Sequence, residues 1–242
     1  RLMMGPLRPK NPIGGTMFAG KVLKLGPGCS RFKVGDDIFG SVMHGAYGER
    51  LVVPEEGPIA LMPAKATYAE AASMPYGAGS ALTFIKDMAK VKAGERVLIL
   101  GASGGVGRFA VQLAKHLGAE VTGVCSAKNA EVARDAGADV VLDYRKEDFR
   151  ARGERYDVIF DTAMVASFPD VRPSLTQSGR FLTLFISLRI IFDLFWTSLF
   201  GEKKALFGVD LGSQEGTERI AELWEAGGLT PLVDKIFPFE DI

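Results

Sequence analysis

One stretch constrains the fold of this chain more than any other: the apolar run Arg96–Leu100, which leads directly into a glycine-rich turn over 101–107. Apolar residues then repeat at helical spacing, at Val106, Phe109, Ala110, Leu113, Ala114 and Leu117. Strand, tight turn and helix in this order are typical of a dinucleotide site, where free N–H groups at the helix start face a pyrophosphate. Gly104 and Gly107 occupy the second and third glycine positions of that fingerprint, and Ala102 occupies the first.

The residues after the turn keep alternating between strand and helix patterns. Six strands are expected: Arg96–Leu100, Glu120–Cys125, Val140–Tyr144, Tyr156–Asp161, Gly179–Phe185 and Lys203–Val209. Because helical stretches separate most of them, the pattern predicts an α/β fold with a doubly wound parallel sheet. A last helix is expected over Thr217–Glu225, followed by extended chain over Leu229–Phe239.

The first quarter of the chain has a different pattern. Glycine and proline punctuate residues 12–62, and short apolar alternations fall at Ala19–Leu25, Asp37–Gly40 and Glu49–Pro54. This pattern predicts a small unit of short β-strands and turns. Residues 64–90 are expected to be helical, with a break at Pro75.

Composition limits the partners and the compartment. The chain has 242 residues, 47% of them hydrophobic and 24% charged, which is ordinary globular composition for one large or two modest domains. Its 29 basic and 29 acidic residues balance, and no basic tract points to nucleic acid or an anionic membrane.

The two cysteines bear on the compartment. Cys29 and Cys125 lie far apart, so no disulfide framework is expected. Because no signal peptide is visible either, a reducing cytoplasm is predicted. Because the chain starts at Arg1 and ends abruptly at Ile242, a trimmed or partly ordered polypeptide is expected.

The apolar segment Leu184–Phe200 invites a membrane interpretation. Arg189 and Asp193 interrupt it, and it is shorter than the ~20 residues that a membrane span needs. Ser187 is placed to cap a helix. We therefore expect a buried or interface helix here rather than a membrane anchor.

The end of the second expected strand bears on which dinucleotide binds. In NAD sites an acidic residue about 20 positions past the glycine turn accepts hydrogen bonds from the ribose hydroxyls. Here Gly123–Asn129 contains no Asp or Glu, whereas Ser126 offers a hydroxyl and Lys128 a cation that suits a 2′-phosphate. This favours NADPH over NADH, although a solvated loop would also be rich in such residues. Tyr144, at the next strand end, is placed either to contact the adenosine or simply to pack.

Together these segments resemble the medium-chain dehydrogenase/reductase superfamily, in its zinc-independent, quinone-oxidoreductase-like branch. The resemblance is carried, in order, by Gly15–Gly20, Phe32–Gly40, Gly45–Glu49, Pro75–Ala81, Gly101–Gly107 and Tyr156–Asp161. It implies a GroES-like β domain over 1–74 and 229–242, shortened at both ends, and a Rossmann domain over 75–228. The family places its active site in the cleft between two such domains.

The resemblance also implies the role of each site residue. Ser103, Gly104, Gly105 and Val106 would hold the pyrophosphate, and Gly107, also assigned to the cofactor site, would let the helix pack close to the strand. Ser126, Lys128 and Tyr144 would contact the 2′-phosphate and adenosine. Ser80 and the segment Leu184, Phe185 and Ile186 would approach the nicotinamide. The strand over 203–209 would form the edge through which the family commonly dimerises.

Departures from the family pattern refine the chemistry. Thr16 and Met17 stand where the zinc branch has its His-Glu pair, and the chain's two histidines are His44, in a loop, and His116, at an exposed helical position. A catalytic zinc needs three converging protein ligands, so no metal is expected. The segment after Asp161 also lacks a glycine that the family often has there.

Without a metal to polarise a carbonyl, hydride transfer to a quinone or an α,β-unsaturated carbonyl is the favoured reaction. Tyr47 is a weak candidate for the proton donor, and packing is its favoured role. Four aromatic residues would line a pocket or belong to the core: Phe185, Phe192, Phe195 and Trp196.

Other functions stay open beside the favoured quinone or enone reductase. They are a catalytically weak nucleotide-binding or regulatory homologue, an alcohol or aldehyde dehydrogenase, and a plain nucleoside-binding module.

Overall fold

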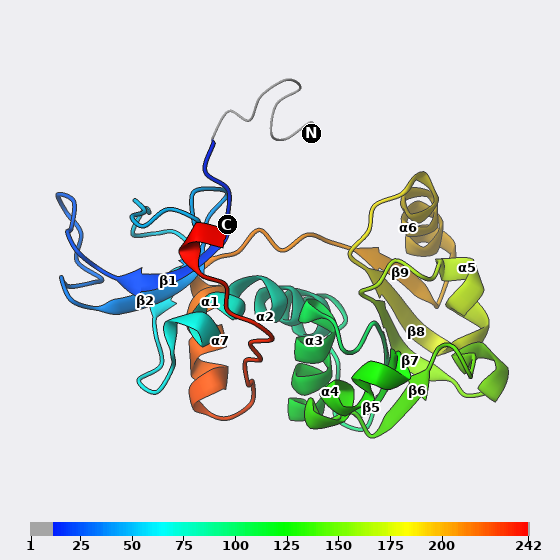
Figure 1. Cartoon of the computed structure of the whole chain (residues 1–242). Helices are drawn as coiled ribbons and strands as arrows, with labels where there is room; N and C mark the ends of the chain where they lie inside the picture. The colour runs from blue at the N-terminus through cyan, green and yellow to red at the C-terminus, as the bar shows by residue number, and fades with distance from the viewer. Residues whose placement is uncertain (1–11, 242) are drawn as a thin grey trace. The chain divides into compact units, whose positions relative to one another are not determined.

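The computed structural model describes residues 12–241 and divides them into two compact units (Figure 1). One unit comprises residues 12–79 and 211–241, and the other comprises residues 80–210. The sequence predicted that the second domain covers residues 75–228, so the observed unit begins later and ends earlier than expected. Helix α7 (Gln214–Glu225) belongs to the first unit because it packs against strand β3 (Ile59–Leu61) and its Glu218 pairs with Arg31 at 2.8 Å.

A six-stranded parallel sheet forms the centre of the second unit. Its strands are β4 (Arg96–Leu100), β5 (Glu120–Cys125), β6 (Val140–Asp143), β7 (Tyr156–Asp161), β8 (Leu175–Thr183) and β9 (Lys204–Phe207). They lie in the order β6-β5-β4-β7-β8-β9, which is the 3-2-1-4-5-6 arrangement of a doubly wound fold. All six predicted strands form, so the predicted fold class is confirmed. Strand β8 begins before the predicted Gly179 and ends before Phe185.

Helices accompany this sheet along the chain. They are α2 (Pro75–Ala81), the π-helix η1 (Leu82–Met88), α3 (Gly105–His116), α4 (Ala130–Asp135), α5 (Phe168–Val171) and α6 (Leu188–Phe200). Helix α3 packs its predicted apolar face on β4 and β5. Phe84 of η1 stacks on Phe160 of β7, with ring centroids 4.9 Å apart, and both rings are fully buried. As expected, the helical region 64–90 breaks at Pro75, which follows α1 (Tyr68–Ser73).

The first unit contains a small antiparallel sheet. Strands β1 (Met17–Lys21), β2 (Asp37–Ser41) and β3 pair in that order around a core of Phe32, Ile38 and Ile59. The prediction of a strand over Glu49–Pro54 is wrong, because this segment finds no partner strand among the described residues and Val52 is 97% exposed. The expected extended tail forms no strand between Leu229 and the short helix η5 (Phe239–Asp241).

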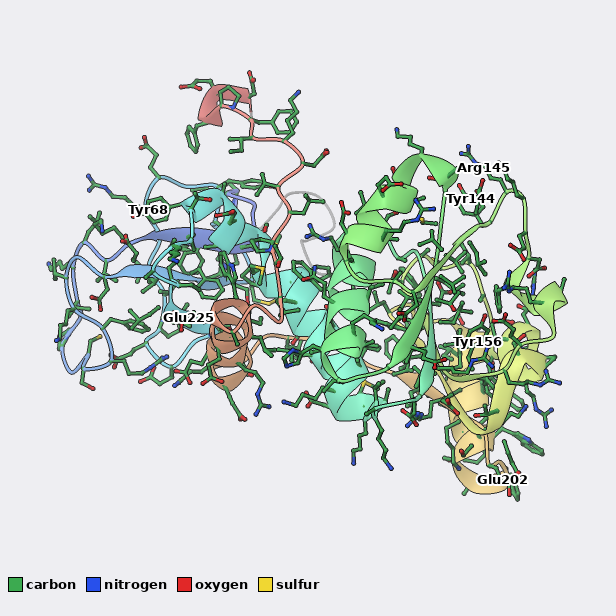
Figure 2. All side chains as sticks on the ribbon, turned by 90° about the horizontal axis from the view of Figure 1, so that it is seen from below. Tyr68, Tyr144, Arg145, Tyr156, Glu202 and Glu225 are labelled. Atoms are coloured by element: carbon green, nitrogen blue, oxygen red, sulfur yellow. The ribbon has the colours of Figure 1, made fainter. Side chains whose placement is uncertain are left out.

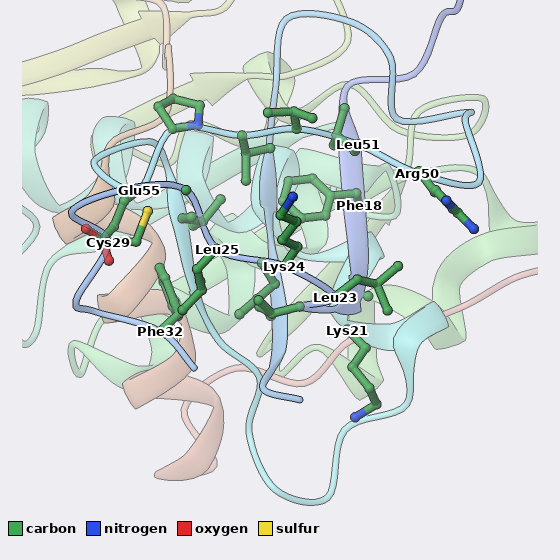
Figure 3. A pocket seen from close by; sticks show the side chains of 18 of the residues that line it. Phe18, Lys21, Leu23, Lys24, Leu25, Cys29, Phe32, Arg50, Leu51 and Glu55 are labelled. Atoms are coloured by element: carbon green, nitrogen blue, oxygen red, sulfur yellow. The ribbon is translucent and has the colours of Figure 1, made fainter. Parts of the chain in front are cut away.

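A cavity of about 870 Å³ opens within the first unit (Figure 3). Phe18, Leu25 and Phe32 line it together with the loop that carries Glu55. The carboxylate of Glu55 accepts a hydrogen bond from the N–H of Ser30 at 2.7 Å, which ties this loop to the one that follows β1. Apolar side chains, short loops and charged side chains, among them Lys21, Lys24 and Arg50, therefore form the walls of this cavity.

Helix α6 begins where the sequence predicted, since Ser187 caps it by accepting a hydrogen bond from the N–H of Ile190 at 3.1 Å. It packs against β9 through its buried residues Ile190 and Thr197. Of the expected alternatives, a buried or an interface helix, burial holds for only one of its faces, because most of its other apolar side chains are exposed.

The buried residue Asp193 of α6 makes stability depend on pH. Its side chain is 9% exposed, its Oδ2 has no hydrogen-bond partner, and the Nε of Arg189 lies 3.7 Å from that oxygen. Burial raises the pKa of Asp193 above its ordinary value, and the nearby Arg189 lowers it only in part. Folding therefore favours the protonated acid, so the stability it provides is present at low pH and is lost as pH rises through the folded-state pKa.

Replacing Asp193 with asparagine is expected to raise the free energy of unfolding at pH 8 by about 1–2 kcal/mol, because it removes a buried charge whose Oδ2 accepts no hydrogen bond and has only the distant pair with Arg189. The gain should shrink as the pH is lowered toward 4. Urea denaturation at several pH values measures the gain at pH 8 and its decrease at lower pH. Asp135→Asn, at an exposed site on α4, is the matched control. A variant less stable than the parent at pH 8 would show that the carboxylate stabilises α6.

Candidate dinucleotide site

The carboxyl ends of five neighbouring strands bring most of the predicted site residues to one edge of the sheet. The register pairs Leu100 of β4 with Val124 of β5 and with Asp161 of β7, and it pairs Cys125 with Asp143 and Asp161 with Thr183. The residues that directly follow this edge are Tyr144, Ser126, Gly101, Thr162 and Leu184, in order across the sheet. Ligands of doubly wound sheets bind outside this edge, where the strand order reverses.

The glycine turn closes tightly over the end of β4. Gly101 has a φ of +84°, and its N–H donates to the carbonyl of Val124 at 2.9 Å. A Cβ at Gly101 would lie 2.7 Å from the hydroxyl of Thr162, and one at Gly107 would lie 2.1 Å from the carbonyl oxygen of Gly101. The helix therefore approaches the turn so closely that only glycine fits at position 107, which agrees with the role predicted for it.

Helix α3 presents free donors at its start. Gly104 is the N-cap, and within residues 12–241 the N–H groups of Gly105, Val106 and Gly107 have no protein acceptor. The first turn carries no acidic side chain, and a Cβ at Gly105 would meet nothing within 4 Å. Unpaired N–H groups and the positive end of a helix dipole together attract an anion. The residues present fit a pyrophosphate.

Ser103 connects this turn to the next strand end. Its hydroxyl accepts a hydrogen bond from the Nδ2 of Asn129 at 3.4 Å. It also lies beside the buried thiol of Cys125, whose pKa is raised by burial above its ordinary value. The structure thus joins two segments predicted to contact the dinucleotide, the turn and the loop after β5.

The loops after β5 and β6 form a cationic corner. Lys128, on the short helix η2 (Ala127–Asn129), is exposed and pairs with no carboxylate of the described chain. Tyr144 is 58% exposed, and its N–H donates to the carbonyl of Cys125 at 3.2 Å. The guanidinium of Arg145 lies 5.6 Å from the Tyr144 ring centroid, and Figure 2 shows both residues at one end of the sheet. An adenosine 2′-phosphate would find cations here.

Sequence reasoning missed Arg145. The available signal was a basic residue directly after the aromatic residue that ends the third strand. Like Lys128, Arg145 forms no ion pair with the rest of residues 12–241, and its N–H donates to the carboxylate of Asp143 at 3.1 Å. It is therefore a second candidate for phosphate binding at this corner.

Sequence reasoning also missed the structural part played by Asp161. This carboxylate is fully buried at the end of β7, and it accepts hydrogen bonds from the N–H groups of Ala163, Val165 and Ala166 at 2.9–3.0 Å. The hydroxyl of Thr162 donates to the carbonyl of Leu100 at 2.8 Å. The loop that departs from the family pattern is therefore fixed to the strand that bears the glycine turn.

The residues predicted near the nicotinamide lie in two places of the same unit. Ser80 is on α2 and only 2% exposed. Leu184, Phe185 and Ile186 follow β8, and the last two line a cavity of about 160 Å³ that Asp193 also lines. This cavity leaves room for a small group beside the segment, and the role predicted for these residues stays a prediction.

Tyr47 and the residues at the zinc-branch positions lie in the other unit. The Tyr47 side chain is 55% exposed, its N–H donates to the carbonyl of Gly14 at 3.1 Å, and its ring leaves no room for a Cβ at Gly15. These contacts favour packing as its role. Thr16 directly precedes β1 and Met17 is the first residue of that strand. No group of three His, Cys, Asp or Glu side chains in residues 12–241 is arranged to hold a metal ion.

Comparison with known proteins supports the same family as the motifs. A family model described as zinc-binding dehydrogenase matches residues 136–242. A chloroplastic quinone-oxidoreductase homologue of Spinacia oleracea is 34% identical over 85% of this chain and 68% of its own length. A mitochondrial NAD(P)H oxidoreductase of Bos taurus is 30% identical over 94% of this chain and 65% of its own length. The chain thus spans about two thirds of these relatives.

Solved structures agree with these relatives. A mycobacterial protein complexed with NADPH matches with a TM-score of 0.80 and 25% identity, covering 94% of this chain and 76% of that one. The CurK enoyl reductase matches with a TM-score of 0.78 and 26% identity, covering 93% and 71%. The chain belongs to the medium-chain dehydrogenase/reductase superfamily of oxidoreductases, in its quinone-oxidoreductase-like branch.

Proposed function

We propose that this chain is the larger part of an NADPH-dependent reductase that works without a metal and transfers hydride to a quinone or an α,β-unsaturated carbonyl. The observation that carries the proposal is the corner after β5 and β6, where Lys128 and Arg145 are exposed cations without carboxylate partners in the described chain. A 2′-phosphate needs such cations, and a ribose-binding carboxylate would repel it. The names of the quinone-oxidoreductase and enoyl-reductase relatives support the acceptor class.

In this proposal NADPH supplies the hydride, and the protein binds and orients it. The free N–H groups of Gly105, Val106 and Gly107 hold the pyrophosphate, together with Ser103 and Gly104. Ser80 and the segment Leu184–Ile186 flank the nicotinamide. The acceptor is activated by its own conjugated carbonyl, so orientation and exclusion of water provide most of the catalysis. Tyr47 stays a weak candidate for the proton donor.

We further propose that the protein forms a homodimer through β9. This strand lies at the edge of the sheet, where a strand can pair with a second copy, and of its N–H groups that of Ala205 already donates to the hydroxyl of Thr197. A reducing cytoplasm stays the predicted compartment, on the basis of the two unpaired cysteines.

Replacing Lys128 with alanine is expected to weaken NADPH binding by about 1–3 kcal/mol, because one charge-assisted contact to the 2′-phosphate is lost. NADH binding should change little, since NADH has no phosphate at that position. Isothermal titration of both cofactors measures the difference. Lys92→Ala, an exposed lysine before β4, is the control. Equal losses for the two cofactors would contradict the assigned role.

Turnover is tested separately from binding. NADPH oxidation is measured with quinones, alkenals and simple aldehydes, and we expect the first two classes to be reduced and the aldehydes not. NADPH binding without oxidation by any of them would favour the regulatory alternative. Reduction of aldehydes alone would favour an alcohol dehydrogenase.

A further inference from the structure

Helix α6 turns its apolar side chains away from the protein. Ile190, Asp193 and Thr197 are its buried residues, and they follow one another at spacings of three and four. Seven large apolar side chains are each at least 49% exposed: Leu188, Ile191, Phe192, Phe195, Trp196, Leu199 and Phe200. At about 100° per residue these seven cover roughly half of the helix circumference, opposite the buried stripe.

The polarity of α6 is the reverse of that of an ordinary surface helix. Its hydroxyl and carboxylate face inward: Thr197 accepts a hydrogen bond from the N–H of Ala205 at 3.1 Å, and Asp193 is buried beside it. On the outer face the rings of Phe192 and Trp196 stack at 6.1 Å, and those of Trp196 and Phe200 lie 4.9 Å apart. A continuous aromatic strip is therefore held in contact with solvent, which soluble surfaces normally avoid.

Unpaired cations gather at the end of this helix. The Nζ of Lys203 donates to the carbonyls of Arg172 and Leu175 at 2.8 and 2.9 Å. Leu175 also pairs with Tyr156, which directly follows Arg155, so the backbones of Arg155, Arg172 and Lys203 meet at one edge of the sheet. Burial, and then the charges of Arg155 and Arg172, lower the pKa of Lys203 below its ordinary value. Neither these nor Lys204 form an ion pair with any carboxylate of residues 12–241.

Paired ions elsewhere on the same unit make this cluster distinctive. Arg150 pairs with Asp148 at 2.8 Å, and Arg152 pairs with Glu147 and Glu154. Glu202, at the end of α6, is the acidic residue next to the cluster, and it pairs with none of the three cations. The sequence shows no basic tract because Arg155, Arg172 and Lys203 come together only through the fold.

We propose that the exposed face of α6 binds the surface of an anionic lipid bilayer, lying in the interface with its aromatic strip among the acyl chains and the exposed side chains of Arg155 and Arg172 at the lipid phosphates. An apolar face rich in Phe and Trp beside a cationic cluster is the composition of interfacial helices. None of the helices in residues 12–241 has the length and apolar character to cross a bilayer, so α6 lies on the membrane. A second copy of the chain could cover the aromatic rings of α6, but it would offer no phosphate to the neighbouring cations, so we favour the bilayer.

The proposal is tested by floating the protein with vesicles of phosphatidylcholine alone and of phosphatidylcholine with phosphatidylglycerol. We expect flotation with the anionic vesicles and little with the neutral ones, and we expect salt to reduce it. A W224F variant leaves Trp196 as the single tryptophan, because the chain has two. Its emission should shift to shorter wavelength on anionic vesicles and be quenched by brominated acyl chains.

Matched variants separate the two contributions. Phe192→Ser with Phe195→Ser should lower the partition coefficient by about tenfold or more. Arg155→Gln with Arg172→Gln should lower it by about tenfold on anionic vesicles only. The controls are Val52→Ser, an exposed apolar residue, and Lys24→Gln with Lys65→Gln, two exposed cations of the other unit. Circular dichroism checks that each variant is folded.

Two results would overturn the proposal. One is the absence of flotation and of Trp196 quenching with the W224F protein, which does not depend on the stability of the other variants. The other is a change of oligomeric state, measured by light scattering, when Phe192 and Phe195 are replaced in a protein that does not bind vesicles. That result would assign the face to a second copy.

Discussion

Gly107→Ala is expected to destabilise the protein by about 3 kcal/mol or more and to abolish dinucleotide binding. The new Cβ would lie 2.1 Å from the carbonyl oxygen of Gly101, 2.8 Å from its carbonyl carbon and 3.1 Å from the Cα of Ala102. These are backbone atoms that cannot move aside without separating α3 from the turn after β4. Separation would also misdirect the free N–H groups that face the pyrophosphate.

Gly105→Ala is the matched control for this prediction. A Cβ at Gly105 would meet nothing within 4 Å, and alanine is the better residue inside a helix. We expect its free energy of unfolding to equal or slightly exceed that of the parent. Urea denaturation compares the two variants directly. Equal losses of stability in the two variants would show that the close approach of α3 to the turn is not the reason why glycine is needed at position 107.

Asp161→Ala is the second large effect, with an expected loss of about 3–5 kcal/mol. The substitution leaves the N–H groups of Ala163, Val165 and Ala166 without their acceptor at a position that is fully buried. Each buried donor without a partner costs about 1–3 kcal/mol, and bonds to a carboxylate are stronger than neutral ones. The loop after β7 would then be held at the end of β4 only by the two bonds from Thr162 to the carbonyl of Leu100.

Asp161→Asn is the graded comparison, because an amide keeps one acceptor oxygen and loses the other. Its stability should fall between those of the parent and the alanine variant. Hydrogen exchange of the amides of Ala163, Val165 and Ala166 locates the effect, and all three should lose protection in the alanine variant. Unchanged exchange at these amides would show that the loop does not depend on the carboxylate.

The strands of the parallel sheet could be predicted because both faces of such a sheet are buried. Their sequences are therefore short apolar runs, and β4, β5 and β7 form at the predicted residues. The early part of β8 was missed because Thr176, Gln177 and Ser178 are polar. Its pairing with β7 is also irregular there, since the register shifts between Tyr156 and Val158.

Features that depend on contacts between distant residues could not be predicted from local pattern. The unit to which α7 belongs is set by packing on β3 and by the pair between Arg31 and Glu218, which are 187 positions apart. In the same way, the composition of residues 184–200 predicted a helix, but it did not predict which face of that helix would be buried. The glycine turn and Lys128 were found because each is a local signal next to a strand end. Asp161 was predicted only as the end of a strand, because no local pattern shows that it anchors the loop after it.

The division of the chain has a consequence for its synthesis. Residues 80–210 form one continuous unit, whereas the other unit is built from residues before and after it. A ribosome therefore completes the dinucleotide-binding unit first, and that unit can fold as soon as it emerges. The three strands of the antiparallel sheet are made before that unit, but Arg31 meets Glu218 of α7 only after the whole inserted unit has been made. During that interval β3 exposes the surface that α7 later covers, which makes the first unit the part of the nascent chain most in need of protection from aggregation.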